Sequence, residues 1–237
     1  FFTPASLTEG LLDDLTAQGV DFGSQSLLDP ACGGAAFLAP IALRMRTLLS
    51  ERGFTALKVL KHIEKHLYGC DLDKTLCELS RHFLCMALHE QIQRTNYVPS
   101  FNVRAANSLT TLAACLGTVD VVVCNPPYRK MTAEELAPLR ATYADVIEAQ
   151  PNLYCLFISL CVRLLRIGGR AALVTPTSHA VVPELLTLLE AEAGEFLSAF
   201  EGMSANAMAV ALAHNPRLRN PFSSDELPPY ALLVELL

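Results

Sequence analysis

The sequence predicts an α/β fold with a doubly wound, mostly parallel sheet. Short apolar runs typical of strands alternate with segments that repeat apolar residues at helical spacing. Several of these runs are continuously apolar, as in strands that are buried on both faces. The 237 residues, of which 51% are hydrophobic and 18% charged, suffice for one domain with a substantial core. This composition excludes disordered and collagen-like classes.

The first part of the chain predicts alternating helices and strands. A short helix opens it, with Thr3 as N-cap, Pro4 at the first helical position and Gly19 as the stop. The elements that follow are a strand at 26–29, a turn at 30–34, a helix at 36–49, a strand at 66–71, a helix at 74–93 and a possible strand at 101–106.

The second part begins with the clearest strand, at residues 119–124, which is rich in β-branched residues and ends before two prolines. A helix at 153–165, closed by Gly168 and Gly169, precedes a strand at 171–174. Weaker patterns predict a helix at 183–192 and strands at 196–201, 208–213 and 230–237.

Charge and cysteine usage limit the possible partners and location. The formal net charge of −6 argues against a basic face over the whole chain, so any DNA affinity must be regional. The eight cysteines lie in apolar runs without a C-x-x-C pair or zinc spacing, which indicates reduced packing residues. No apolar stretch is long enough to span a bilayer. We therefore expect a cytoplasmic protein that does not enter a membrane.

Three predicted strands end in polar residues, Asp29, Asp71 and Asn125, which should share one edge of the sheet. The pair Gly33-Gly34 allows the backbone to approach a ligand closely, and Asp71 is placed to accept hydrogen bonds from a ribose diol. A nucleoside-bearing cofactor fits this pattern. NAD and ATP are disfavoured, because there is no G-x-G-x-x-G or P-loop sequence. A plain turn at the glycines and a helix-capping role for Asp71 remain alternatives.

Residues 125–128, N-P-P-Y, form a sharper motif. Two prolines directly after a buried strand prevent further pairing and hold the backbone extended. The amide oxygen of Asn125 and the carbonyl of Pro126 would then be two fixed acceptors, with the Tyr128 ring as a flat wall. That arrangement suits a planar NH₂ group. The alternative is a proline-rich strand exit with a capping Asn.

Three motifs together carry a family resemblance. Residues 29–38 are similar to D-P-A-C-G-[SG]-G-x-F-L, residues 125–128 match [DNS]-P-P-[YFW], and residues 1–4 look like F-Y-T-P. In this order they resemble the γ-class N6-adenine DNA methyltransferases, which have the Rossmann-like fold of class I methyltransferases dependent on S-adenosylmethionine (SAM). The resemblance implies methyl transfer from SAM to the N6 amine of a flipped-out adenine, in a restriction-modification system.

The resemblance also implies roles for individual residues, and no metal. The catalytic residues would be Asn125, Pro126, Pro127 and Tyr128. Cofactor-binding residues would be Phe2, Thr3, Pro4, Asp29, Ala31, Cys32, Gly33, Asp71, Leu72, Asn107 and Ser108.

The sequence departs from the family pattern at three positions. Ala35 replaces Gly, and both Asn107 and Asn152 replace Asp. We expect the Ala35 methyl group to lie where the backbone approaches SAM, which would weaken SAM binding. Asn107 keeps the ability to hydrogen-bond the SAM adenine but carries no charge.

We expect residues 1–237 to form a catalytic domain without its target-recognition domain. Double-stranded DNA would bind through a recognition domain outside this chain, with a restriction endonuclease or specificity subunit as a possible partner. Near the site, the positive charges of Arg129 and Lys130 are balanced by acidic residues, so we expect only weak electrostatic attraction of DNA phosphates. Two other functions fit: a protein-glutamine methyltransferase, which also uses N-P-P-Y, and a non-catalytic SAM-binding subunit.

Overall fold

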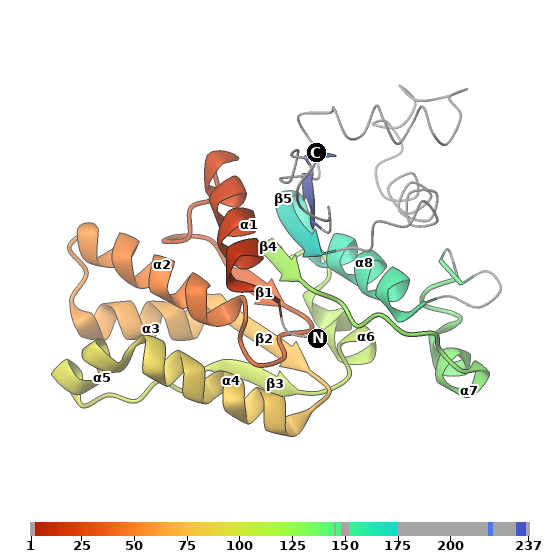
Figure 1. The fold of residues 1–237 in the computed structure, drawn as a ribbon, viewed down its shortest axis with the longest axis horizontal. Helices are drawn as coiled ribbons and strands as arrows, with labels where there is room; N and C mark the ends of the chain where they lie inside the picture. Colours follow the sequence, from red (N-terminus) through yellow and green to blue (C-terminus); the bar gives the residue numbers. More distant parts are fainter. Residues whose placement is uncertain (1–2, 145, 148–151, 175–217, 220–230, 236–237) are drawn as a thin grey trace.

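A single mixed sheet runs through the centre of the computed structural model, which describes residues 3–144, 146–147, 152–174, 218–219 and 231–235 (Figure 1). The seven strands have the order β3-β2-β1-β4-β5-β7-β6, and β1 to β5 are parallel. β7 is antiparallel to both β5 and β6. The predicted doubly wound, mostly parallel α/β fold is confirmed. The strands are β1 (Leu27–Asp29), β2 (Leu67–Asp71), β3 (Asn102–Ala105), β4 (Val119–Cys124), β5 (Leu165–Val174), β6 (Leu218–Arg219) and β7 (Ala231–Glu235).

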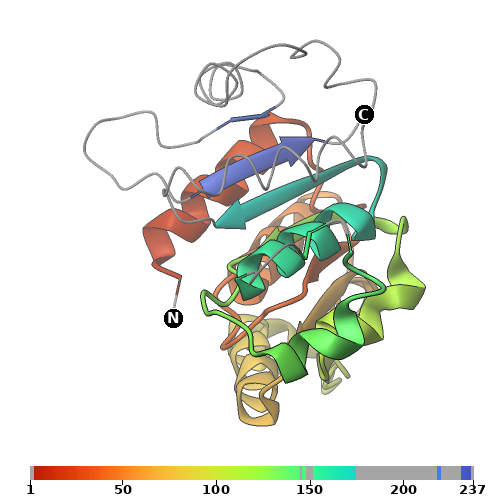
Figure 2. The same ribbon diagram turned by 90° about the vertical axis from the view of Figure 1, so that its right-hand side faces the viewer.

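Helices cover both faces of this sheet. Figure 2 shows α1 and α8 on opposite sides of β5. Within the described ranges, no helix is long and apolar enough to cross a membrane. The helices are α1 (Ala5–Ala17), α2 (Leu38–Glu51), α3 (Ala56–His66), α4 (Lys74–Ala87), α5 (His89–Thr95), α6 (Ser108–Thr111), α7 (Ala133–Leu136) and α8 (Leu153–Leu164), with 3-10 turns at Leu112–Cys115 and Ala137–Leu139.

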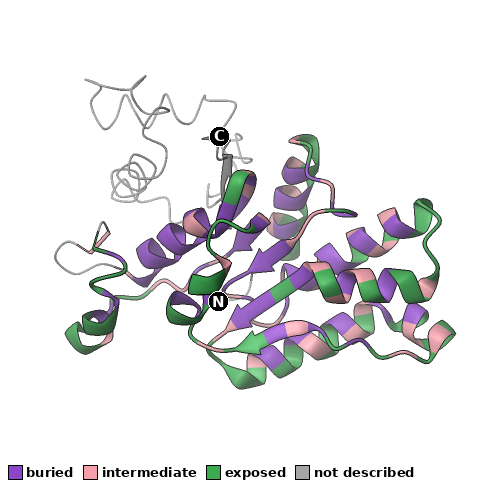
Figure 3. Cartoon of the chain, turned by 180° about the vertical axis from the view of Figure 1, so that it is seen from behind, coloured by how far each residue is buried: buried purple, intermediate pink, exposed green. Residues whose placement is uncertain are grey.

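The central strand β4 divides the apolar core into two clusters. Successive side chains of a strand point to opposite faces of the sheet. Val121 and Val123 therefore join the cluster under α1 and α2, whereas Val122 and Cys124 join the cluster under α8. All four side chains are fully buried, and Figure 3 shows most of β4 coloured as buried. This double burial explains why β4 reads as a continuous apolar run.

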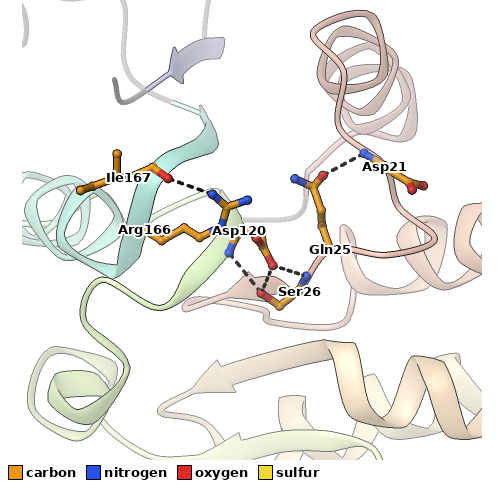
Figure 4. Close-up of polar contacts among 6 residues, drawn as sticks. All are labelled: Asp21, Gln25, Ser26, Asp120, Arg166 and Ile167. Atoms are coloured by element: carbon orange, nitrogen blue, oxygen red, sulfur yellow. Dashed lines mark hydrogen bonds and ion pairs between the residues drawn. The ribbon is translucent and has the colours of Figure 1, made fainter.

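The amino-terminal ends of the strands are joined by a polar cluster around Asp120 (Figure 4). Oδ2 of Asp120 accepts hydrogen bonds from the backbone N–H (2.8 Å) and the hydroxyl (2.6 Å) of Ser26. Oδ1 pairs with Arg166. Burial raises the pKa of Asp120, but the bonds from Ser26 and Arg166 outweigh it and leave that pKa below its usual value. These contacts tie β1, β4 and β5 together at the end opposite the strand ends discussed below.

Several predicted elements are confirmed. The strand at 119–124 is β4, the helix at 153–165 is α8, and the weak strand at 230–237 contains β7. Gly19 has the left-handed φ of +85° that ends α1. The predicted elements at 183–192, 196–201 and 208–213 lie outside the described residues.

Three predictions about elements are wrong, and one helix was missed. The helix at 74–93 is two helices that meet at Leu88, and α3 was not expected. Pro4, not Thr3, is the N-cap of α1, and no side chain caps that helix. Gly168 and Gly169 lie inside β5. A β-carbon on Gly169 would lie 2.9 Å from the carbonyl oxygen of Arg166, so close backbone packing requires this glycine.

Candidate functional site

The strand order reverses between β1 and β4, which are neighbours in the sheet. The chain continues from β1 to β2 on one side and from β4 to β5 on the other, so the loops after β1 and β4 diverge. Ligands of open α/β sheets bind at this type of switch point, beyond the carboxyl ends of the strands. The first loop starts at Asp29 and the second at Asn125, so the structure brings the two main sequence motifs together.

Three side chains hold the backbone of the glycine loop after β1. The backbone N–H of Gly33 donates to Oδ2 of Asp71 over 2.9 Å, and the hydroxyl of Ser80 donates to the carbonyl of Gly33 over 2.6 Å. The hydroxyl of Ser108 donates to the carbonyl of Pro30 over 2.6 Å. The conformation of the loop is therefore set from β2, α4 and the start of α6.

Sequence reasoning missed Ser80. The sequence feature that could have identified it is a polar residue on the apolar face of α4. Ser80 lies between Cys77 and Leu84 on that face, and all three side chains are buried. A buried hydroxyl needs a hydrogen-bond partner, and the Gly33 carbonyl supplies it.

In the glycine loop, the space beside Gly33 is free of other atoms of the chain, whereas Ala35 is packed against the core. Gly33 has φ +49°, and a β-carbon built there would meet no atom within 4 Å. Ala35 has φ +64° and is only 2% exposed, packed in the core cluster that contains α2. The Ala35 methyl group, which was expected where the backbone approaches SAM, is therefore buried in the core. The departure from Gly costs backbone strain of about 1–2 kcal/mol instead.

Asp29 is a buried carboxyl group at the base of the site. It is 2% exposed, and Oδ1 accepts the backbone N–H of Ala31 over 3.0 Å. Burial raises the pKa of Asp29 to about 8, the N–H of Ala31 lowers it, and the negative charge of Asp71 raises it further. A cation bound beside these two carboxyl groups would favour the ionised form of Asp29.

The N-P-P-Y motif leaves the end of β4 and is held by hydrogen bonds from two directions. Nδ2 of Asn125 donates to the hydroxyl oxygen of Thr3 over 3.0 Å. The hydroxyl of Tyr128 lies 3.0 Å from Oδ1 of Asn125 and 2.6 Å from the carbonyl oxygen of Val174. The Tyr128 ring is 5.9 Å from that of Tyr154 on α8, and burial raises the pKa of Tyr128.

Backbone contacts join this motif to the start of α8. Lys130 and Asn152 form an antiparallel bridge, and the N–H of Leu153 donates to the carbonyl of Arg129 over 2.8 Å. Asn152 is the N-cap of α8 without a side-chain capping bond. The segment that follows Tyr128 is therefore anchored to a buried helix.

Of the remaining predicted cofactor residues, Leu72, Asn107 and Ser108 follow the ends of β2 and β3, and Cys32 lies in the loop after β1. Leu72 is 74% exposed beside Asp71, and Asn107 caps α6 by accepting the N–H of Leu109. Cys32 and Ser108 are both 2% exposed, so neither residue presents much surface to a ligand. Phe2 lies outside the described residues.

The guanidinium group of Arg129, near the site, is paired with a carboxylate. Both terminal nitrogens of Arg129 bond the carboxylate of Glu135, at 2.9 and 2.7 Å, and this pairing lowers the pKa of Glu135 to about 2. The carboxylate of Glu135 therefore offsets the positive charge that Arg129 would offer to a phosphate. Across the described residues there is no group of three or more His, Cys, Asp or Glu side chains placed to hold a metal ion. All eight cysteines are free thiols.

Known structures share this fold at low sequence identity. A putative class I S-adenosylmethionine-dependent methyltransferase from Listeria monocytogenes has a TM-score of 0.53 and 20% identity, over 99% of this chain and 60% of that one. A modification subunit of a putative type I restriction enzyme from Vibrio vulnificus has a TM-score of 0.56 and 20% identity, over 80% and 38%. A nuclease-deletion mutant of the type ISP restriction-modification enzyme LlaGI, in complex with a DNA substrate mimic, has a TM-score of 0.64 and 13% identity, over 100% and 23%.

The chain thus spans 60% or less of the length of these three proteins. A comparison with curated proteins finds no match. The family model of the N-6 DNA methylases, in contrast, matches residues 1–180, which include both strand-end motifs. Together with the fold and the paired loops at the switch point, this match places the chain in the N-6 DNA methylase family.

Proposed function

We propose that this chain is the catalytic domain of a DNA methyltransferase that transfers a methyl group from SAM to the N6 amine of a flipped-out adenine. The observation that carries the proposal is the position of the N-P-P-Y motif at the switch point, beside a loop whose backbone is fixed by Asp71, Ser80 and Ser108. Membership of the N-6 DNA methylase family supports adenine as the target base.

The residues at the first loop fit SAM. Each carboxylate oxygen of Asp71 accepts one backbone N–H, from Gly33 and from Asp73, and keeps a further lone pair for a ribose hydroxyl. The open side of Gly33 leaves room for the amino-acid end of the cofactor, and exposed Leu72 offers an apolar surface to the adenine ring. The carboxyl groups of Asp29 and Asp71 favour a cationic ligand.

Methyl transfer then requires that the loop after β4 align the substrate amine with the methyl group. When bound, SAM supplies an already activated methyl group. Oδ1 of Asn125 and the carbonyl of Pro126 would accept the two N6 hydrogens of the substrate, which draws the nitrogen lone pair out of conjugation and directs it at the methyl carbon. These two preset acceptors also stabilise positive charge that grows on N6 during in-line displacement. As the new N–C bond forms, the bond between the methyl carbon and sulfur would break and leave a neutral thioether, and the N6 proton would leave afterwards to water.

The Tyr128 ring offers a stacking surface for the displaced base. Flipping an adenine out of the duplex costs a few kcal/mol, and stacking on an aromatic side chain returns roughly 1–3 kcal/mol of this. The contacts of the Tyr128 hydroxyl with Val174 and Asn125, together with the neighbouring Tyr154 ring, hold the surface in place.

Recognition of a DNA sequence is proposed to reside outside this chain. Arg129 is paired with Glu135, and the net charge of the chain is −6, both of which disfavour strong phosphate binding by this chain alone. Double-stranded DNA, a specificity subunit or a restriction endonuclease would be partners of the whole protein, which we expect in the cytoplasm.

The test is methyl transfer by the complete gene product, supplied with labelled SAM and unmethylated DNA. In parallel reactions DNA is replaced by a glutamine-bearing protein or omitted, and calorimetry measures SAM binding. Label in N6-methyladenine supports the proposal, and the variant Asn125→Ala should lower it by about 100-fold or more while SAM still binds. Label in glutamine would instead support the protein methyltransferase, and SAM binding without any transfer would support a non-catalytic subunit.

A further inference from the structure

The side-chain amide of Asn125 lies between two hydroxyl groups from distant parts of the chain. Thr3, which precedes α1, accepts a hydrogen bond from Nδ2 over 3.0 Å. On the other side, the hydroxyl of Tyr128 faces Oδ1 at 3.0 Å. The plane of the amide is therefore held at both of its ends.

The orientation of the Asn125 amide decides whether its oxygen, which accepts hydrogen bonds, or its NH₂ group, which donates them, faces the substrate amine. The oxygen and the NH₂ group of Asn have nearly the same shape, but only the oxygen accepts a hydrogen bond from a substrate amine. A rotation by half a turn would place N–H donors against the N–H donors of that amine. Such a site would have the same shape but could not accept a hydrogen bond from the substrate amine.

Tyr128 by itself does not set this direction. Its hydroxyl carries one proton, and the carbonyl oxygen of Val174, at 2.6 Å, is the nearer acceptor. When that proton points to Val174, the phenol oxygen presents lone pairs to Asn125 and attracts the NH₂ end of the amide. A partner for Nδ2 on the opposite side counters this attraction, and Thr3 is that partner.

We propose that Thr3 is a positioning residue, whose hydroxyl holds Nδ2 of Asn125 so that Oδ1 stays available to the substrate amine. This inference rests on the proposed function and deepens it. It gives Thr3 a role in orienting the acceptor oxygen of Asn125. This role is distinct from the contact with the cofactor that the family resemblance implies for Thr3.

The experiment compares Thr3→Val, which removes the hydroxyl at nearly constant shape, with Thr3→Ser, which keeps it. Thr47→Val is the matched control, because the Thr47 hydroxyl is exposed and bonds only the carbonyl of Leu43 in its own helix. Single-turnover methyl transfer to DNA and the Kd for SAM are measured for the complete protein. One orienting hydrogen bond predicts that Thr3→Val loses about 3- to 10-fold in rate with little change in the Kd for SAM. Thr47→Val should retain the rate, and Thr3→Ser, which keeps the hydroxyl, should lose less of it than Thr3→Val.

A second measurement does not depend on activity. In protein labelled with ¹⁵N at asparagine, the side-chain NH₂ signals of Asn125 are assigned by their loss in Asn125→Ala. We expect slow solvent exchange of these protons in the wild type and in Thr3→Ser, and exchange faster by about threefold or more in Thr3→Val.

The outcomes separate this inference from the proposed function. If the wild type transfers no methyl group to DNA, the proposed function fails, and the NMR comparison still decides the role of Thr3. If the Asn125 side-chain protons exchange with solvent at the same rate in Thr3→Val as in the wild type, the inference is overturned. A loss of SAM affinity in Thr3→Val at an unchanged single-turnover rate also overturns it, because Thr3 would then serve the cofactor.

Discussion

The backbone N–H of Gly33 donates a hydrogen bond to Oδ2 of Asp71 over 2.9 Å, which links the loop after β1 to the end of β2. The other oxygen, Oδ1, accepts the N–H of Asp73 at the start of α4. One carboxylate therefore supports two backbone turns at the edge of the sheet where the cofactor is proposed to bind. Its removal affects both the loop and the binding site.

We predict that Asp71→Ala lowers SAM affinity by about tenfold or more and the free energy of unfolding by roughly 1–3 kcal/mol, since two backbone N–H groups lose their acceptor. Calorimetry and urea denaturation measure the two effects. The matched control is Asp73→Ala, which removes the N-cap of α4. It should cost about 1 kcal/mol of stability and leave SAM binding intact. Equal SAM affinity in Asp71→Ala and the wild type would contradict the role of Asp71.

A second prediction concerns the two left-handed positions of the glycine loop. Gly33→Ala places a methyl group on the open side of the loop at φ +49°, so SAM affinity should fall by about tenfold or more. Ala35→Gly should leave SAM affinity nearly unchanged, because the Ala35 methyl group is buried in the core. Its stability should change by less than about 1 kcal/mol, since relief of strain offsets the lost methyl group and the added chain entropy. A tenfold gain in SAM affinity for Ala35→Gly would show that the methyl group obstructs the cofactor.

The third prediction is the pH dependence of stability due to Asp29. Its folded-state pKa of about 8 is above the value of an unfolded aspartate, so between about pH 4 and pH 8 the folded state holds one proton more. The free energy of unfolding should therefore fall with rising pH by up to about 1.4 kcal/mol per pH unit from this group. Asp29→Asn should remove that slope.

Urea unfolding of the unliganded protein at several pH values between about 5 and 7 measures the slope. His62 and His66, whose pKa values burial lowers, add an opposite trend that is the same in both proteins. The difference between wild type and variant therefore isolates Asp29. Asp13→Asn, at an exposed carboxylate paired with Arg44, is the control. Parallel wild-type and Asp29→Asn curves would refute a raised pKa at Asp29.

The fourth prediction separates the ring of Tyr128 from its hydroxyl. Tyr128→Phe keeps the stacking surface and should lose less than about tenfold in transfer rate, whereas Tyr128→Ala removes the surface. For Tyr128→Ala the loss should be greater with paired adenine than with adenine opposite an abasic site, because the latter is already unstacked. Single-turnover methylation of the two duplexes gives the comparison. Equal losses on both would argue against stacking.

The sequence was most informative where local chemistry leaves few choices. The β-branched run and two prolines determine the bounds of β4, and the strand ends at Asp29, Asp71 and Asn125 do lie at one edge of the sheet. The motif residues were found because proline, glycine and carboxylate at strand ends have few structural roles. Their roles in catalysis and cofactor binding stay predictions until the variants are measured.

Local patterns were misleading where distant residues decide. Gly168 and Gly169 look like a helix end, but Gly169 is required inside β5 because the backbone of Arg166 and Asp120 lies against it. Ser80 carried no motif, although its buried hydroxyl holds the Gly33 carbonyl.

The sequence by itself determined the fold class, the family and the two loops that carry the chemistry, since these follow from short-range patterns of apolar residues and turn residues. Only the tertiary structure decided that the Thr3 hydroxyl pairs with Asn125, 122 positions away, and that the Ala35 methyl group points into the core. Hydrogen-bond partners and the direction of a side chain depend on which elements pack together. That information is distributed over the whole chain and is absent from any single motif.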